Sequence, residues 1–183
     1  MDGHSEVERL ARDVRHRGPI FSVVREHIRL PSGLEQDLEI VEHDGAVAVA
    51  ALTAEGSMVL VRQYRHAVGR SLLEVPAGRL EPGEDPAAAA HRELEEETGL
   101  KAGSLTLLRE FFPAPGFCSE HMTLFLARDL SPAGAGRLSP DADEELEVLE
   151  LPPAEVLCRS LDAKTLVAAA LLMSATAVQE RVT

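Results

Sequence analysis

The sequence is poor in aromatic residues and has no tryptophan. Aromatic side chains make up only 3% of the chain, with one tyrosine and five phenylalanines, whereas hydrophobic residues as a whole make up 45%. A core of ordinary size can therefore form, but it must consist mainly of leucine, valine and alanine. At 183 residues, the length predicts one domain, or one domain with a small extension.

Cysteines and long apolar runs are also scarce. Cys118 and Cys158 follow no metal-binding or redox spacing, and this indicates a reducing compartment. The most apolar stretch, 166–178, is interrupted by Ser174 and Thr176 and is too short to cross a bilayer. Residues 1–17 are polar and lack the apolar centre of a signal peptide. We therefore expect a cytoplasmic protein with no membrane partner.

Positive charge is in the minority. Eighteen lysines and arginines face 31 aspartates and glutamates, for a net charge of −13. This balance argues against nucleic acid or an anionic membrane as a partner. A small phosphate-bearing ligand stays compatible with it, because local cations or a bound metal can reverse the field at a site.

The most informative segment spans residues 78–100. Seven fixed residue types and two aliphatic positions recur there at fixed spacings: Gly78, Glu84, Arg92, Glu93, Leu94, Glu96, Glu97, Gly99 and Leu100. From average residue usage, the chance of such a pattern at a given starting position is on the order of 10⁻⁸ or below. The pattern therefore demands a chemical explanation.

Local chemistry suggests that explanation. Asp85 is a good N-cap, Pro86 fits the first helical position and Gly99 supplies a stop, so a helix is predicted between them. Glu93 and Glu97 then share one face, with Glu96 close beside them. Clustered carboxylates repel one another unless a cation lies between them, and Mg²⁺ prefers partial sets of oxygen ligands completed by substrate phosphates. The alternative is a solvated acidic face with an ordinary Arg92–Glu96 ion pair.

The rest of the chain reads as strands with few helices. Apolar or alternating patterns predict strands over 21–30, 38–42, 46–52, 58–65, 71–75, 105–112, 121–127 and 146–151. Two further helices are predicted, a short one from Pro153 and one over 162–179. A long loop is predicted over 129–145, and loops of that length are often functional. This order indicates an α+β sandwich. Residues 1–44 form a β extension with too few strands to be stable alone, and 45–183 form the main domain.

Segment 78–100 resembles the signature of the Nudix hydrolases, which cleave nucleoside diphosphates linked to another group. Pro115, sixteen residues after Gly99, resembles the proline that marks the ADP-ribose pyrophosphatase branch, and the likeness covers roughly 21–170. It implies a Nudix α/β/α sandwich with a mixed sheet, preceded by a small N-terminal antiparallel β extension. It also implies hydrolysis of ADP-ribose to AMP and ribose 5-phosphate.

In that branch the protein is a homodimer, whose exchanged extension completes the partner's pocket; Phe21 is the only aromatic residue there to stack on adenine. Two alternatives stay open. One is a pyrophosphatase for another nucleoside diphosphate derivative, such as a sugar nucleotide, a dinucleotide or a flavin cofactor. The other is an ADP-ribose sensor without catalysis.

The resemblance also assigns residues. It implies a site for Mg²⁺, Mn²⁺ or another divalent cation, held by the Ala77 carbonyl, Glu93 and Glu97, with Glu96 assisting. Arg92 joins these glutamates as a catalytic candidate, and Glu84 orients the loop or helix. The candidates for substrate binding are Arg65 at the diphosphate, Glu120 at the terminal ribose, Arg62 and Phe117. The alternatives are a strand-end surface arginine for Arg65 and a loop surface charge for Glu120.

The acidic part of the long loop departs from the family pattern. The branch usually carries Glu-x-Glu there, as general base and extra metal ligand. Alignment through Leu146 places Glu144 at the metal-ligand position, with a catalytic role, and Ala142 at the base position. The base stays unassigned among Asp141, Asp143, Glu145, Glu96, Glu97 and a water acidified by the metal. Ala114 stands where a hydroxyl side chain that contacts ribose is frequent.

Overall fold

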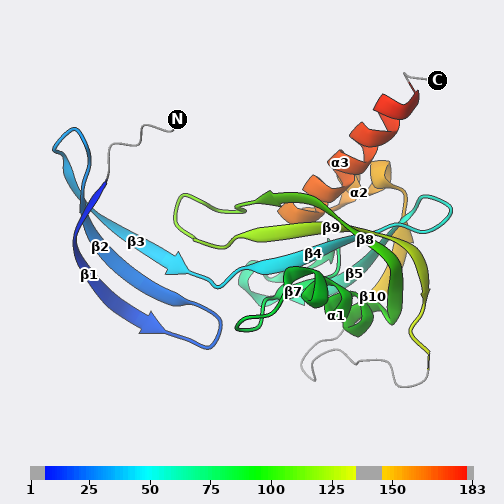
Figure 1. Ribbon diagram of the computed structural model, residues 1–183, viewed down its shortest axis with the longest axis horizontal. Coiled ribbons are helices and arrows are strands. Elements are labelled where there is room, and N and C mark those ends of the chain that lie inside the picture. Colours follow the sequence, from blue (N-terminus) through cyan, green and yellow to red (C-terminus); the bar gives the residue numbers. More distant parts are fainter. Residues whose placement is uncertain (1–6, 135–145, 181–183) are drawn as a thin grey trace. The chain divides into compact units, whose positions relative to one another are not determined.

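The computed structural model describes residues 7–134 and 146–180, with side chains up to residue 174 (Figure 1). The described chain divides into two compact units. The first contains residues 7–45 together with Phe112–His121, and the second contains Ala46–Phe111 and the described residues from Met122 onward. Each unit is described by itself.

The first unit is built on an antiparallel sheet of three strands in the order β1-β2-β3, namely β1 (Glu8–Arg17), β2 (Ser22–Arg29) and β3 (Glu35–Glu42). Its register places Val24 opposite both Val14 and Ile40. The N-terminal antiparallel extension is thus confirmed, but the sequence analysis missed β1. The reason is that β1 is mostly polar and exposed, and ion pairs across the strands, such as Arg29–Glu8, take the place of an apolar pattern.

The second unit contains two sheets. One is mixed, in the order β7-β4-β9-β8, with β4 parallel to β9 and the other neighbours antiparallel. The other is antiparallel, in the order β10-β5-β6. The strands are β4 (Ala46–Ala51), β5 (Met58–Arg65), β6 (Arg70–Glu74), β7 (Ala77–Arg79), β8 (Leu100–Phe111), β9 (Met122–Pro132) and β10 (Leu146–Leu151), with a short 3-10 helix at His66–Val68 after β5.

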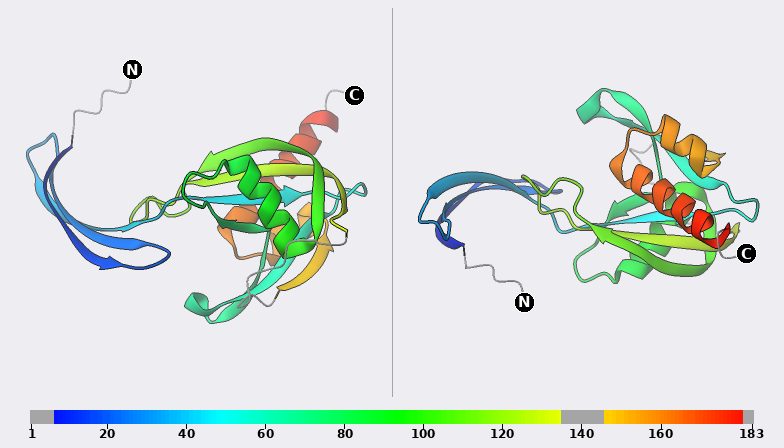
Figure 2. Two further views of the ribbon diagram at one scale, coloured as in Figure 1. Left: turned by 60° about the horizontal axis from the view of Figure 1, so that its bottom comes forward. Right: turned by 90° about the horizontal axis from the view of Figure 1, so that it is seen from above.

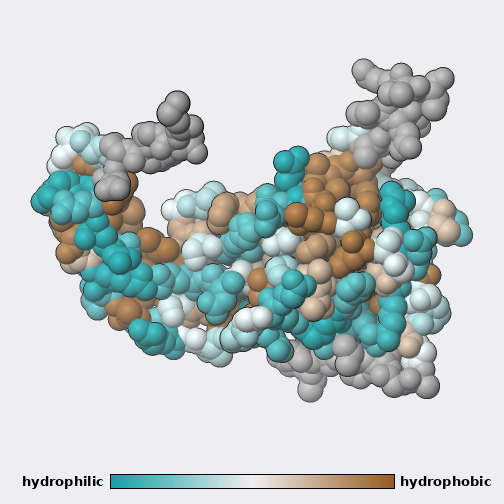
Figure 3. All heavy atoms as spheres, in the orientation of Figure 1, coloured by the Kyte–Doolittle hydropathy of each residue, from teal (hydrophilic) through white to brown (hydrophobic). Residues whose placement is uncertain are grey.

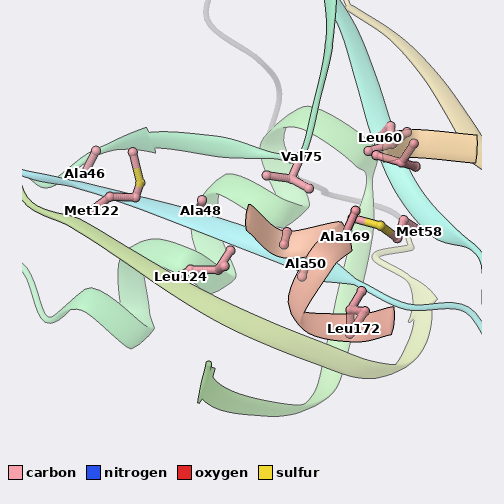
Figure 4. Packing of buried hydrophobic residues seen from close by; sticks show 12 residues of the cluster. Ala46, Ala48, Ala50, Met58, Leu60, Val75, Met122, Leu124, Ala169 and Leu172 are labelled. Carbon is pink, nitrogen blue, oxygen red and sulfur yellow. The ribbon is translucent and has the colours of Figure 1, made fainter. Parts of the chain in front are cut away.

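Strand β4 separates two hydrophobic cores because both of its faces are buried. Ala46, Ala48 and Ala50 face a cluster that includes Val156 of helix α2 (Pro153–Arg159) and Ala168, Ala169 and Leu172 of α3 (Ala163–Glu180) (Figure 4). Val47, Val49 and Ala51 face Ala89, Ala90 and Leu94 of helix α1 (Pro86–Thr98). Helices therefore cover both faces of the mixed sheet (Figure 2), and the predicted α/β/α sandwich is confirmed.

Several predicted boundaries need correction. Residues 77–79 lie in none of the predicted strands, yet they form β7, which pairs with the start of β4. Strand β8 begins at Leu100, and β9 continues to Pro132, into the stretch expected as loop. Backbone pairing between β8 and β9 extends these strands through residues without hydrophobic alternation, where Gly103 leaves room for Asp129. No helix in the described part of the chain combines the length and apolar character needed to cross a bilayer.

Candidate active site

Helix α1 carries the acidic residues of the motif, and its ends form as predicted. The Asp85 carboxylate accepts hydrogen bonds from the backbone N–H groups of Ala87 and Ala88, both at 3.0 Å, and Pro86 occupies the first turn. Gly99 adopts φ 71° and donates its N–H to the carbonyl of Glu95. Because the left-handed conformation is strained for residues with a Cβ, the motif needs glycine at this stop.

The acidic face of α1 lies against the backbone of β7. Glu93 and Glu97 are only 8% and 5% exposed to solvent, and Glu96 is partly buried beside them. Glu97 accepts a hydrogen bond from the backbone N–H of Ala77 at 3.3 Å. A Cβ on Gly78 would lie 2.1 Å from Oε1 of Glu93, so only glycine permits this approach. The motif glycine and the motif glutamate are thus two sides of one contact.

Arg92 is the cation at the centre of the cluster. Its Nε and Nη2 each donate to the Glu84 carboxylate at 3.0 Å. Its Nη1 donates to Glu93 at 2.6 Å and to Glu96 at 2.9 Å. The hydrogen bonds with Glu84 are the largest cause that raises the pKa of Arg92, and the same bonds lower the pKa of Glu84. The Arg92–Glu96 ion pair exists, but as one contact in a network that orients the glutamates.

The donor set suits a divalent cation. Within 7–134 and 146–180, no three aspartate, glutamate, histidine or cysteine side chains form a ready-made metal cage. Mg²⁺ seldom needs one, since it usually takes one or two carboxylates and completes its shell with water and substrate phosphates. Buried carboxylates at Glu93 and Glu97, with Glu96 adjacent, provide such a partial set of hard oxygen ligands.

Of the two arginines predicted at the substrate, Arg65 is the one that pairs with a buried carboxylate of the second unit. It ends β5, and its Nε and Nη2 donate to the two carboxylate oxygens of Glu74, both at 2.8 Å. These hydrogen bonds are the first cause that raises its pKa, and the nearby charge of Glu97 adds to the effect. Arg65 therefore lies within electrostatic reach of the acidic face of α1. Arg62, by contrast, is exposed and pairs with Glu147 of β10 at 2.9 Å.

The other predicted residues are not joined to this group by the described structure. Phe117 and Glu120 belong to the first unit, where the Phe117 carbonyl accepts a hydrogen bond from the Val41 N–H at 2.8 Å. Phe117 is exposed and Glu120 is partly buried. Their role in binding stays a prediction. Glu144 and the base position at Ala142 lie outside the described residues.

Two buried partners of this site escaped the sequence analysis, Glu74 of β6 and Lys164 of α3, whose side chains form an ion pair. The signal for Glu74 was present: a single carboxylate stands within the apolar strand segment Leu72-Leu73-Glu74-Val75. A charge there is costly unless it is paired. The pairing with Lys164 joins residues 90 apart in sequence, which no local pattern reveals.

Comparison with known proteins agrees with this arrangement. The ADP-ribose pyrophosphatase of Bacillus subtilis is 42% identical over 146 residues, covering 80% of this chain and 78% of that protein. The methanol dehydrogenase activator of Bacillus methanolicus is 40% identical, over 82% of this chain and 84% of that protein. A solved structure described as an ADP compounds hydrolase superimposes with a TM-score of 0.83 at 25% identity, covering 99% of this chain and 100% of that one. The NUDIX domain model matches residues 42–172, and the chain therefore belongs to the Nudix family.

Proposed function

We propose that this protein is a metal-dependent pyrophosphatase that hydrolyses the diphosphate bond of ADP-ribose to AMP and ribose 5-phosphate. The observation that carries the proposal is the buried acidic face of α1, where Glu93 and Glu97 lie against β7. The similarity to the Bacillus subtilis ADP-ribose pyrophosphatase over most of both chains supports the choice of substrate.

Residues of the second unit have separate roles in metal binding, in orienting the glutamates and in binding the diphosphate. Glu93, Glu97 and the Ala77 carbonyl, with Glu96 assisting, would hold the cation, which would neutralise the diphosphate and polarise a phosphorus. Arg92 keeps Glu93 and Glu96 oriented through its contacts with both. Arg65 meets the diphosphate as a planar donor of several hydrogen bonds. Water then attacks one phosphorus in line: its oxygen forms the new P–O bond and gives up a proton to the unassigned base, the bond from that phosphorus to the bridging oxygen breaks, and AMP and ribose 5-phosphate are released.

Further assignments belong to the same proposal. Mg²⁺ is the metal we expect, with Mn²⁺ as a substitute, because the donors are carboxylates. Glu144 supplies another ligand, Phe117 and Glu120 contact the substrate, and the general base stays unassigned. The protein acts as a homodimer in the cytoplasm. These assignments rest on the family resemblance and on the composition of the chain.

A substrate panel tests the function. ADP-ribose, a sugar nucleotide, a dinucleotide and a flavin dinucleotide are incubated with the protein and Mg²⁺, and the nucleoside monophosphate released is quantified. We expect ADP-ribose to be cleaved with the highest kcat/KM and chelation of the metal to abolish cleavage. A higher kcat/KM for another compound would assign that compound as the substrate. Binding of ADP-ribose without cleavage would indicate a sensor.

Glu97→Gln tests the role of the acidic face. The amide keeps the shape of the side chain but removes a metal-binding charge, so turnover should fall by several orders of magnitude with the fold intact. Glu95→Gln is the matched control, because it removes the same charge from the same helix at a residue whose partner is Lys101. Turnover of Glu97→Gln within a few fold of the wild-type value would refute the assignment.

A further inference from the structure

Glu74 is a buried carboxylate with no part in the function proposed so far. It ends β6 and is only 2% exposed. A carboxylate removed from water is destabilising unless it is paired and hydrogen-bonded. Burial raises the pKa of Glu74, yet the hydrogen bonds and charges of Arg65 and Lys164 outweigh this effect and leave the pKa below its usual value. Two cations therefore keep Glu74 ionised inside the protein.

The start of α3 fixes one of these cations. Lys164 is 11% exposed, and its ammonium group also pairs with Asp162 at 3.1 Å. Asp162 in turn accepts hydrogen bonds from the backbone N–H of Thr165 at 3.0 Å and from its hydroxyl at 2.7 Å. The same hydroxyl oxygen accepts the N–H of Val75 at 2.8 Å. Because Val75 directly follows Glu74, the helix holds both the lysine and the backbone beside the carboxylate.

Glu74 binds the other cation, Arg65, along one edge of its guanidinium. The guanidinium of Arg65 has five N–H donors in a rigid plane, and Glu74 takes one from Nε and one from Nη2. Three N–H groups are not used by Glu74, namely the two of Nη1 and the second of Nη2, and one from each of these nitrogens forms the end-on edge of the guanidinium. The Arg65 side chain is 40% exposed although its partner is almost fully buried. The plane and direction of the remaining edge are therefore set by Glu74, from the buried side.

We propose that Glu74 is a positioning residue, which presents the outer edge of the Arg65 guanidinium to the substrate diphosphate while Lys164 maintains the charge of Glu74. The inference rests on the proposed function, in which Arg65 meets the diphosphate. A planar group held by two parallel hydrogen bonds loses little freedom when a second anion binds its other edge. An arginine without this clamp must be ordered by the substrate itself.

A double-mutant cycle tests the inference. Glu74→Gln, Arg65→Lys and the double variant are compared with the wild type for kcat and KM on ADP-ribose with Mg²⁺. We expect Glu74→Gln to raise KM by about tenfold or more and to have little further effect once Arg65→Lys has removed the planar fork. Two results would overturn the inference: an equal effect of Glu74→Gln in the wild type and in Arg65→Lys, or an unchanged KM when Glu74→Gln is made in the wild-type protein.

Thermal unfolding separates positioning from simple destabilisation. If Glu74→Gln does not fold, Glu74→Asp replaces it in the cycle, since it keeps the charge but withdraws the carboxylate by one methylene group. Glu155→Gln is the control, because it removes the acidic partner of an exposed arginine, Arg159, and should leave KM unchanged.

The two proposals can fail separately. Cleavage of ADP-ribose with no coupling between the two positions would reject the positioning role and leave the function standing. If the panel identifies another diphosphate substrate, the cycle is run on that compound, with the same result expected. If no compound is cleaved, both proposals fall.

Discussion

At the residue scale, the contact between Gly78 and Glu93 explains why two positions of the motif go together. The carboxylate of Glu93 occupies the space that any side chain on Gly78 would need. The glycine is therefore required by close approach rather than by an unusual backbone conformation. The spacing in the sequence follows from β7 and α1 lying against each other.

Gly78→Ala should consequently act as a mutation of Glu93. The added methyl group must push the carboxylate away, and a misplacement of about 1 Å in a catalytic group can lower the rate by about 10²-fold. We expect turnover to fall by that order, with a smaller loss of stability of about 1–3 kcal/mol from overpacking. Steady-state kinetics and thermal unfolding measure the two effects.

Gly116→Ala serves as the stability control for this prediction, because a Cβ there meets no atom within 4 Å. Its melting temperature should equal that of the wild type. Wild-type turnover and Mg²⁺ dependence in Gly78→Ala would show that Glu93 tolerates displacement and has no role in metal binding.

At the scale of elements, local sequence signals predicted the helix and strand whose residues carry those signals. They did not predict strands that form through pairing with a partner strand. The bounds of α1 were predictable because its cap, first-turn proline and terminal glycine all lie in one short segment. The inner strand β4 was predictable from its unbroken apolar run. Strands β1 and β7 were not: one is polar and the other has three residues, and both exist through backbone pairing with a partner strand. The Glu74–Lys164 pair was hidden because it joins side chains 90 residues apart in sequence.

The sheet of the first unit should respond to pH through His27. Its ring nitrogens lie 3.0 Å from the Asp37 carboxylate and 3.2 Å from that of Glu35, and hydrogen bonds with Glu35 and Asp37 raise its pKa above 6.5. Arg25 and Arg29 face the same carboxylates, and the pKa values of both acids are lowered.

The sign of this dependence follows from these shifts. Protonated His27 stabilises the sheet fully below its unfolded pKa of about 6.5, and the contribution is lost as pH rises through the higher folded pKa. The contribution of the two acids is lost instead when pH falls through their lowered pKa values. NMR titration should give a His27 pKa above 6.5, and His27→Gln should remove the weakening of β2–β3 hydrogen-exchange protection that accompanies the rise of pH above 6.5. A pKa at or below 6.5 would contradict the prediction.

At the scale of the whole molecule, the first unit buries too little to be stable alone. Among its described residues, Val24 and Ile28 are the buried hydrophobic side chains, whereas Val14, Ile20, Phe21 and others are exposed. Hydrophobic and hydrophilic side chains lie next to one another on its visible face (Figure 3). Because a small sheet needs a covered apolar face, this sheet must pack on the second unit or, as in the proposed homodimer, on another subunit.

We therefore expect a dimer by light scattering at micromolar concentration. Dilution far below that range should lower the activity per chain, and the loss should follow the appearance of monomer, because the partner's extension completes each pocket in the proposed assembly. Glu97→Gln should remain dimeric and provides a control for oligomer state without catalysis. A monomer with full activity would contradict the prediction.

The two-sided burial of β4 has a consequence for substitutions within it. Alanines occupy the side toward α3, while Val47 and Val49 face α1. Exchanging Ala48 with Val49 would keep the composition and the total side-chain volume of the strand. It would nevertheless overfill the core beneath α3 and leave a cavity beneath α1, and each change is destabilising. The order of two neighbouring aliphatic residues thus carries structural information that their combined composition does not.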